Sequence, residues 1–181
     1  MLVGITGTKG AGKGELSKLL QERGFELFSM GDLVRKEAKE RGIELTKENL
    51  QKLGMLLSKE EGQNFVVRRI ISKVEKDKNY VIEGFRFVED IIPFKKRKDF
   101  SLIGITATLE VRWKRVESRR RADDNLVGFK EFKEYDAIEN TSIKGQNVME
   151  CLKLADFTIA NDGSLDELDK KLTSVMEKIK C

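Results

Sequence analysis

The sequence predicts a three-layer α/β fold in which helices cover both faces of a five-stranded parallel sheet. Short apolar runs alternate with segments in which apolar residues recur at helical spacing, and this alternation is typical of a parallel sheet. The first apolar run also leads directly into a glycine-rich turn. At 181 residues the chain is long enough for a sizeable core, so we expect one domain over residues 1–181.

Each predicted strand is a run of apolar residues that ends at a glycine or a polar residue. The runs cover residues 2–6, 25–29, 80–84, 102–106 and 157–160. Between the first two strands a helix is expected over 15–21, because Leu16, Leu19 and Leu20 share one face and Gly24 follows as a stop signal.

The longest helical stretch is expected between the second and third strands, from Asp32 to about Lys76. Within it, Thr46 is a candidate N-cap for a helix with leucines at helical spacing. A charged, arginine-rich helix follows the fourth strand, and a polar loop is expected after it. The pattern Ser164-x-x-Glu167 is a capping box that predicts the start of the last helix.

Composition excludes several classes of protein. The absence of histidine rules out His-based acid–base chemistry and His-ligated metals, and the two cysteines, Cys151 and Cys181, cannot form a disulfide framework. No apolar run approaches the length of a membrane span, so we expect a cytoplasmic protein with no membrane partner. The formal charge of +4 suits an anionic ligand such as a nucleotide better than a nucleic-acid surface.

The segment Gly7-x4-Gly12-Lys13 is predicted to be a phosphate-binding loop, or P-loop. Gly7, Gly10 and Gly12 allow backbone N–H groups to turn toward one ligand, and Ala11 lies among them. The following helix offers the positive end of its dipole, and Lys13 adds a cation for the outer phosphates. The competing interpretation is an ordinary glycine turn with a surface lysine. The order of strand, loop and helix favours the P-loop.

Gly14 stands where P-loops commonly carry a metal-handling hydroxyl. Here the sequence resembles the adenylate kinase branch of the nucleoside monophosphate kinases, whose loops read Gly-Lys-Gly-Thr, with Glu15 in place of the threonine. Glu15 is a candidate for holding Mg²⁺ or its waters. The alternatives are that its carboxylate repels phosphate, or that it only stabilises the first turn of the helix.

Two further segments resemble acceptor-site motifs of that family. Ser29-Met30-Gly31-Asp32-Leu33-Val34-Arg35 is similar to its Ser-Thr-Gly-Asp-x-x-Arg segment. The resemblance implies that Arg35 grips the acceptor phosphate and that Ser29, Gly31 and Asp32 line the acceptor site. The alternative is that Asp32 caps a helix and Arg35 is solvated.

Glu83-Gly84-Phe85-Arg86 is similar to the Asp-Gly-Phe-Pro-Arg motif of adenylate kinases, without the proline. The resemblance implies that Glu83 orients the water shell of Mg²⁺ and that Gly84 and Phe85 contact the acceptor. Arg86 would hold the acceptor phosphate and stabilise the transferring group.

The run from Arg115 to Asp124 resembles the two ends of the adenylate kinase lid joined together, which implies a short lid over about 115–136. Arg115 would stack on the donor adenine, beside the turn that contains Asn161 and Gly163. Arg119 and Arg121 would approach the transferring phosphoryl group. Arg120 is a local alternative, and Lys130 or Lys133 are candidates to replace a missing lid arginine. The competing interpretation is a solvated basic helix face.

Taken together, the motifs resemble an archaeal P-loop kinase family related to adenylate and dephospho-coenzyme A kinases. This implies a P-loop NTPase fold with a helical monophosphate-binding region over about 30–76. The expected activity is transfer of the ATP γ-phosphoryl group to a nucleoside monophosphate, AMP first, with Mg²⁺ as cofactor. The open alternatives are a dephospho-coenzyme A-type kinase with Asp32 as base, a nucleotide sensor or assembly factor with little turnover, and, ranked last, an RNA-binding accessory protein.

Overall fold

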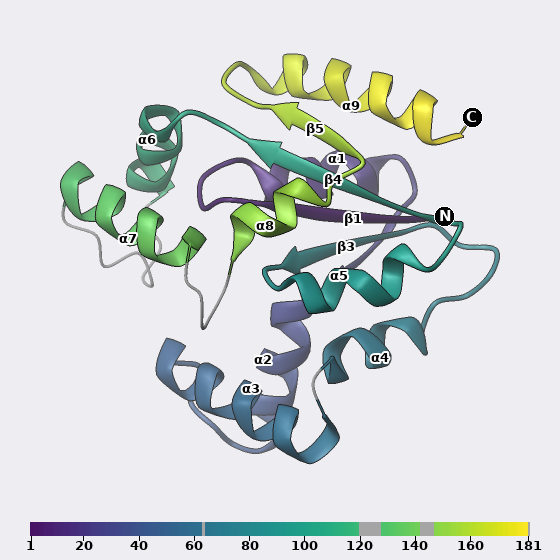
Figure 1. Ribbon diagram of the computed structural model, residues 1–181, viewed down its shortest axis with the longest axis vertical. Coiled ribbons are helices and arrows are strands. Elements are labelled where there is room, and N and C mark those ends of the chain that lie inside the picture. Colours follow the sequence, from purple (N-terminus) through teal and green to yellow (C-terminus); the bar gives the residue numbers. More distant parts are fainter. Residues whose placement is uncertain (63, 120–127, 142–146, 181) are drawn as a thin grey trace.

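The computed structural model describes residues 1–62, 64–119, 128–141 and 147–180. Its centre is a five-stranded parallel sheet in the order β2-β3-β1-β4-β5, which confirms the predicted sheet (Figure 1). The strands are β1 Leu2–Gly7, β2 Glu26–Ser29, β3 Tyr80–Phe85, β4 Phe100–Thr106 and β5 Phe157–Ala160.

The central strand β1 pairs with β3 on one side and β4 on the other, and all six of its residues are buried. Successive side chains of β1 point to opposite faces. Val3 and Ile5 belong to one core cluster and Leu2 to another. A strand buried on both faces explains why the sequence shows an uninterrupted apolar run here rather than alternation.

The helices of the described chain fill the remaining layers. They are α1 Lys13–Glu22, α2 Met30–Glu40, α3 Lys47–Glu61, α4 Phe65–Ile71, α5 Val88–Lys95, α6 Leu109–Arg119, α7 Phe129–Thr141, α8 Val148–Lys153 and α9 Leu165–Lys180. Leucines of α1 and α9 pack with the first cluster, and residues of α5 and α8 pack with the second. Two helical layers therefore enclose the sheet. Among the described residues, no helix is both long and apolar enough to cross a bilayer.

Helices α2, α3 and α4 form an insertion between β2 and β3, gathered below the sheet in Figure 1. The insertion has a small core of its own, made of Ala38, Leu53, Leu57 and Phe65. An ion-pair network also joins its helices, because Arg69 contacts both Glu37 and Glu61, and Arg41 contacts Glu37. Hydrogen bonds from Arg69, then from Arg41, hold the pKa of Glu37 below its ordinary value.

Several predicted details are confirmed and others change. Thr46 caps α3, and the capping-box serine, Ser164, accepts a hydrogen bond from the backbone N of Glu167. The alternative in which Asp32 caps a helix is wrong, because α2 begins earlier and Ser29 is its N-cap. Helices α7 and α8 were not predicted from the sequence. Helix α7 packs against α6 and α8, and α8 packs against α5 and the strands β1 and β4, so tertiary contacts rather than a local pattern hold them.

Candidate active site

The glycine-rich loop leaves the carboxyl end of the central strand and enters α1 at Lys13. Gly10 and Gly12 have φ values of 81° and 106°, in the left-handed region that favours glycine. A Cβ atom on Gly12 would fall 2.3 Å from Nδ2 of Asn161, and one on Gly10 would fall 2.6 Å from the carbonyl oxygen of Arg112. Both close approaches require glycine. Ala11, between them, is fully buried.

Two buried polar side chains support this loop from behind. Asn161 donates from Nδ2 to the carbonyl oxygen of Ala11 at 2.8 Å. Arg112 donates to the carbonyl oxygens of Lys9 at 3.2 Å and Ala107 at 3.1 Å. The bonds to Ala11 and Lys9 use backbone carbonyls of the loop, so they hold it in shape without engaging its N–H groups.

Arg112 also joins the loop to α7. Its guanidinium forms a bidentate pair with Asp136, with N–O distances of 2.6 and 2.7 Å, in surroundings that leave about a tenth of either side chain exposed. The same guanidinium lies 5.7 Å from the centre of the Phe132 ring, and Lys9 lies over the ring of Tyr135 at 5.0 Å. No motif in the sequence indicates a role for Arg112 or Asp136. They lie 24 residues apart, so no local motif signals the pair.

Lys13 opens α1 and reaches back across the loop. Its Nζ donates to the carbonyl oxygens of Gly7 at 2.7 Å and Thr8 at 3.0 Å, which places the ammonium at the loop. Glu15 lies two residues after Lys13, in the first turn of α1. Its Oε1 is 3.3 Å from Nζ of Lys18, and about half of its side chain is exposed. Of the three roles considered for Glu15, this contact favours the one in which the side chain only stabilises the first turn of the helix.

Glu83 lies near the carboxyl end of β3, opposite Ile5 of the central strand. Its Oε2 accepts a hydrogen bond from the hydroxyl of Ser17 at 2.9 Å, and Ser17 itself is only 2% exposed. Gly84 has φ 104°, and a Cβ there would lie 3.2 Å from Cβ of Met30. This glycine therefore lets the end of β3 approach the start of α2.

The neighbouring residue Phe85 turns into the core, where its ring packs edge-on against Phe94 and Phe100. Contact with an acceptor would therefore fall to its backbone rather than its ring. Arg86 follows at the surface, and its carbonyl oxygen accepts a hydrogen bond from the N–H of Asn147 at 2.9 Å.

Residues predicted for the acceptor gather at the start of α2. The Ser29 hydroxyl accepts a hydrogen bond from the N–H of Asp32 at 3.3 Å. Arg35 pairs with Asp32 at 2.7 Å, and its Nη1 passes 3.1 Å from the Cβ position of Gly31. At least half of each charged side chain is exposed, so both lie where a ligand can reach them.

Residues predicted for the donor base are brought together around the turn after β5, at the edge of the sheet opposite β2. Arg115 donates to the carbonyl oxygens of Asn161 at 2.8 Å and Gly163 at 3.3 Å. Between them, Asp162 accepts from the N–H of Thr108, and this bond holds the pKa of Asp162 below its ordinary value. Arg119 is the exposed last residue of α6. Arg120 and Arg121 lie outside the described residues.

The side chains near the loop suit a Mg²⁺ ion that is held mainly by nucleotide phosphates and water, with a single protein carboxylate nearby. Within the described ranges no three acidic or cysteine side chains form a metal cage. Mg²⁺ with nucleotides usually takes one or two carboxylates and completes its shell with phosphates and water. Glu83, a fixed carboxylate near the loop helix, fits that pattern.

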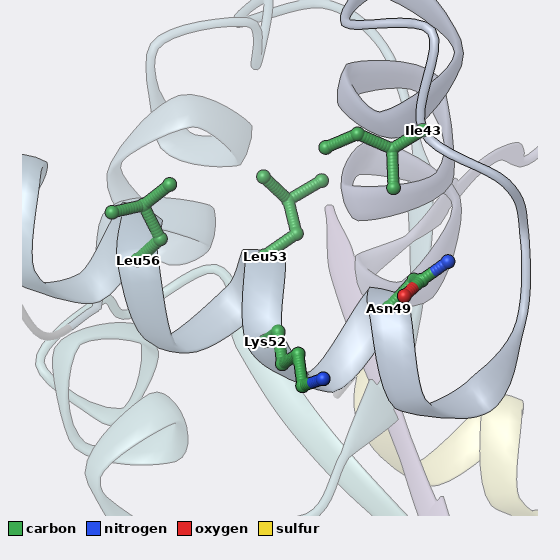
Figure 2. Close-up of a pocket in the computed structure, with 5 residues that line it drawn as sticks. All are labelled: Ile43, Asn49, Lys52, Leu53 and Leu56. Atoms are coloured by element: carbon green, nitrogen blue, oxygen red, sulfur yellow. The ribbon is translucent and has the colours of Figure 1, made fainter.

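A separate hollow lies on the helical insertion, as Figure 2 shows. It has a volume of about 200 Å³ and is lined by Ile43, Asn49, Lys52, Leu53 and Leu56. These residues belong to α3 and the segment before it, so this hollow is distinct from the phosphate loop.

Comparison with known proteins identifies the family. A family model described as an AAA domain matches residues 6–130. A UPF0200 protein of Thermococcus gammatolerans is 34% identical, with 99% of this chain and 95% of that protein covered. The chain belongs to the UPF0200 family. A UPF0200/UPF0201 protein of Archaeoglobus fulgidus is 36% identical over 98% of this chain, which spans 55% of that longer relative.

Solved structures with a fold similar to that of this UPF0200 chain include several small-molecule kinases. A shikimate kinase from Bacteroides thetaiotaomicron has a TM-score of 0.69 at 11% identity, with 100% of this chain and 99% of that chain covered. Dephospho-CoA kinase from Campylobacter jejuni has a TM-score of 0.55 at 18% identity, covering 98% and 96%. At these identities the likeness concerns the fold alone: this chain shares the three-layer α/β fold of those kinases.

Proposed function

We propose that this UPF0200 protein is an ATP-dependent kinase that transfers the γ-phosphoryl group to the phosphate of a nucleoside monophosphate, AMP in the first place. The observation that carries the proposal is the arrangement at the carboxyl edge of the sheet. The phosphate loop follows β1, Glu83 lies near the carboxyl end of the adjacent strand β3, and Arg86 follows that strand. In open parallel sheets, ligands bind at this edge.

The donor nucleotide would occupy the loop. Amides of the segment from Gly7 to Gly14 would face its phosphates, and Lys13 would neutralise their charge. Arg115, with the backbone of Asn161 and Gly163, would border the donor base. Bound Mg²⁺ would supply charge neutralisation between the donor phosphates. Glu83 is the residue we propose to orient its water shell, with Glu15 as a more exposed second candidate.

The acceptor would lie between the insertion and β3, so that residues 30–76 form its binding region. Arg35 offers a planar fork that matches a phosphate, and Arg86, directly after β3, would supply a second one. Ser29, Gly31, Gly84 and the backbone of Phe85 would line the site. Arg119 and Arg121 would add positive charge around the transferring group from a lid over about 115–136. An acceptor phosphate is already anionic, so the reaction needs no general base.

A coupled assay tests this assignment with ATP and Mg²⁺ and, in turn, AMP, CMP, UMP and dephospho-coenzyme A. ADP formation with AMP is the expected result, and activity confined to dephospho-coenzyme A contradicts it. Lys13→Ala is expected to abolish turnover, because the phosphates lose their cation. Full activity in that variant would mean that the loop is not the donor site.

One observation favours a second candidate, a kinase of a nucleotide-like hydroxyl group. Asp32 presents an exposed carboxylate at the acceptor side, and the fold is similar to that of a dephospho-CoA kinase. A hydroxyl acceptor needs a base, so Asp32→Asn should then lower kcat roughly 100- to 10,000-fold. With AMP as acceptor the same change should have a much smaller effect on kcat.

A further inference from the structure

The hydroxyl of Ser17 makes a contact that the proposed reaction does not yet use. Ser17 lies four residues after Lys13, and therefore on the same face of α1. A buried helical serine often bonds a carbonyl of its own helix. Ser17 instead reaches across to β3 and donates to Oε2 of Glu83 at 2.9 Å. The bond joins the loop helix to the adjacent strand at the level of the phosphate loop.

We propose that Ser17 is a positioning residue that holds the Glu83 carboxylate in place to accept hydrogen bonds from the water shell of nucleotide-bound Mg²⁺. This inference rests on the proposed function. A carboxylate has lone pairs on both oxygens, so one bond from Ser17 fixes its direction and leaves acceptor capacity for water. A group held by a buried neighbour acts with less loss of freedom than a mobile surface side chain.

The local chemistry explains why such a device is needed here. Gly14 provides no hydroxyl directly after Lys13, and a Cβ at Gly14 would meet nothing within 4 Å. Glu15 is half exposed and lies against Lys18. Ser17 is the buried hydroxyl one helical turn further on, and it acts on the metal site through Glu83 rather than as a ligand.

Calorimetry tests the inference by measuring the affinity for ATP at Mg²⁺ concentrations that rise from zero. The wild type, Ser17→Ala and Ser17→Thr are compared. Ser17→Ala is expected to weaken binding of Mg·ATP about tenfold, the size of one hydrogen bond to a charged group. Binding of ATP in EDTA should change less than twofold. Ser17→Thr, which keeps the hydroxyl, should stay near the wild type.

A control and a double-mutant cycle separate positioning from packing. Thr173→Ala removes a helical hydroxyl that bonds the carbonyl of Asp169 on α9, and should leave both affinities unchanged. If Ser17 acts through Glu83, the double variant Ser17→Ala/Glu83→Gln should bind Mg·ATP no more weakly than Glu83→Gln alone. Additive losses, or equal losses with and without Mg²⁺, overturn the inference. The inference is also overturned if the ATP affinity of the wild type does not depend on Mg²⁺. If the wild type does not bind ATP at all, the proposed function itself is contradicted.

Discussion

Removing the Asp136 carboxylate tests the buried ion pair that joins α7 to the phosphate loop. In Asp136→Ala the Arg112 guanidinium, whose side chain is 8% exposed, would keep its bonds to two backbone carbonyls but lose its counter-charge. Loss of one partner from a buried pair typically costs about 3–5 kcal/mol. The retained carbonyl bonds favour the lower end, so we expect a loss of about 3 kcal/mol in the free energy of unfolding.

For a chain of this size, each kcal/mol lowers Tm by about 2–4 °C, so the expected drop is roughly 6–12 °C. Thermal unfolding followed by circular dichroism measures it, and calorimetry checks that unfolding is two-state. Glu134→Ala, at an exposed position of the same helix, is the control and should stay within about 0.5 kcal/mol of the wild type. The double change Arg112→Met/Asp136→Leu should be less damaging than Asp136→Ala, because no charge stays buried. A Tm for Asp136→Ala equal to that of the control would refute the reasoning.

Three other outcomes are expected. Gly12→Ala should weaken ATP binding at least about tenfold by calorimetry, because a crowded residue in the left-handed region must accept a Cβ atom. Gly14→Ala, where a Cβ atom meets nothing, should not weaken it. Equal affinities of the two variants would contradict the loop geometry. Arg35→Ala should raise the KM for AMP roughly 10- to 100-fold with little change in the KM for ATP, and an unchanged acceptor KM would count against its role. Burial first, then repulsion by Glu89, raises the pKa of Asp90 from 3.8 to about 6. The folded chain therefore holds this proton more tightly than the unfolded chain. The resulting stability is complete below about pH 4 and is lost as pH rises through about 6. Asp90→Asn should flatten the dependence of the free energy of unfolding on pH, measured by urea unfolding, and should raise that free energy by up to about 3 kcal/mol at neutral pH. An unaltered pH dependence would exclude Asp90 as its cause.

The strands and the phosphate loop were predictable because their signals are local. The runs around Leu2 and Tyr80 are apolar and continuous since both strands are buried on two faces, and the loop repeats glycine where the chain must turn closely. Element boundaries shifted by one or two residues, as at Met30, where the cap rather than the apolar pattern decides where α2 begins.

The supports of the site were not predictable, because they depend on distant parts of the chain. Arg112 meets Asp136 from another helix, and Ser17 meets Glu83 across 66 positions. The sequence around Ser17 and around Arg112 does not show whether either side chain is buried and bonded or solvated. The sequence therefore predicts the strands and the glycine-rich loop better than the buried contacts that support them.

The burial of β1 has a consequence for motion in the protein. All six of its residues are buried and it is paired on both sides, so exposing its amides requires disruption of the whole sheet. Hydrogen exchange should consequently be slowest in the strand that carries the phosphate loop. Nucleotide would then meet amides that are already ordered, and little conformational freedom would be lost at that wall on binding. Changes of shape during a catalytic cycle would fall to the helices around the loop, while the loop itself serves as the fixed reference point.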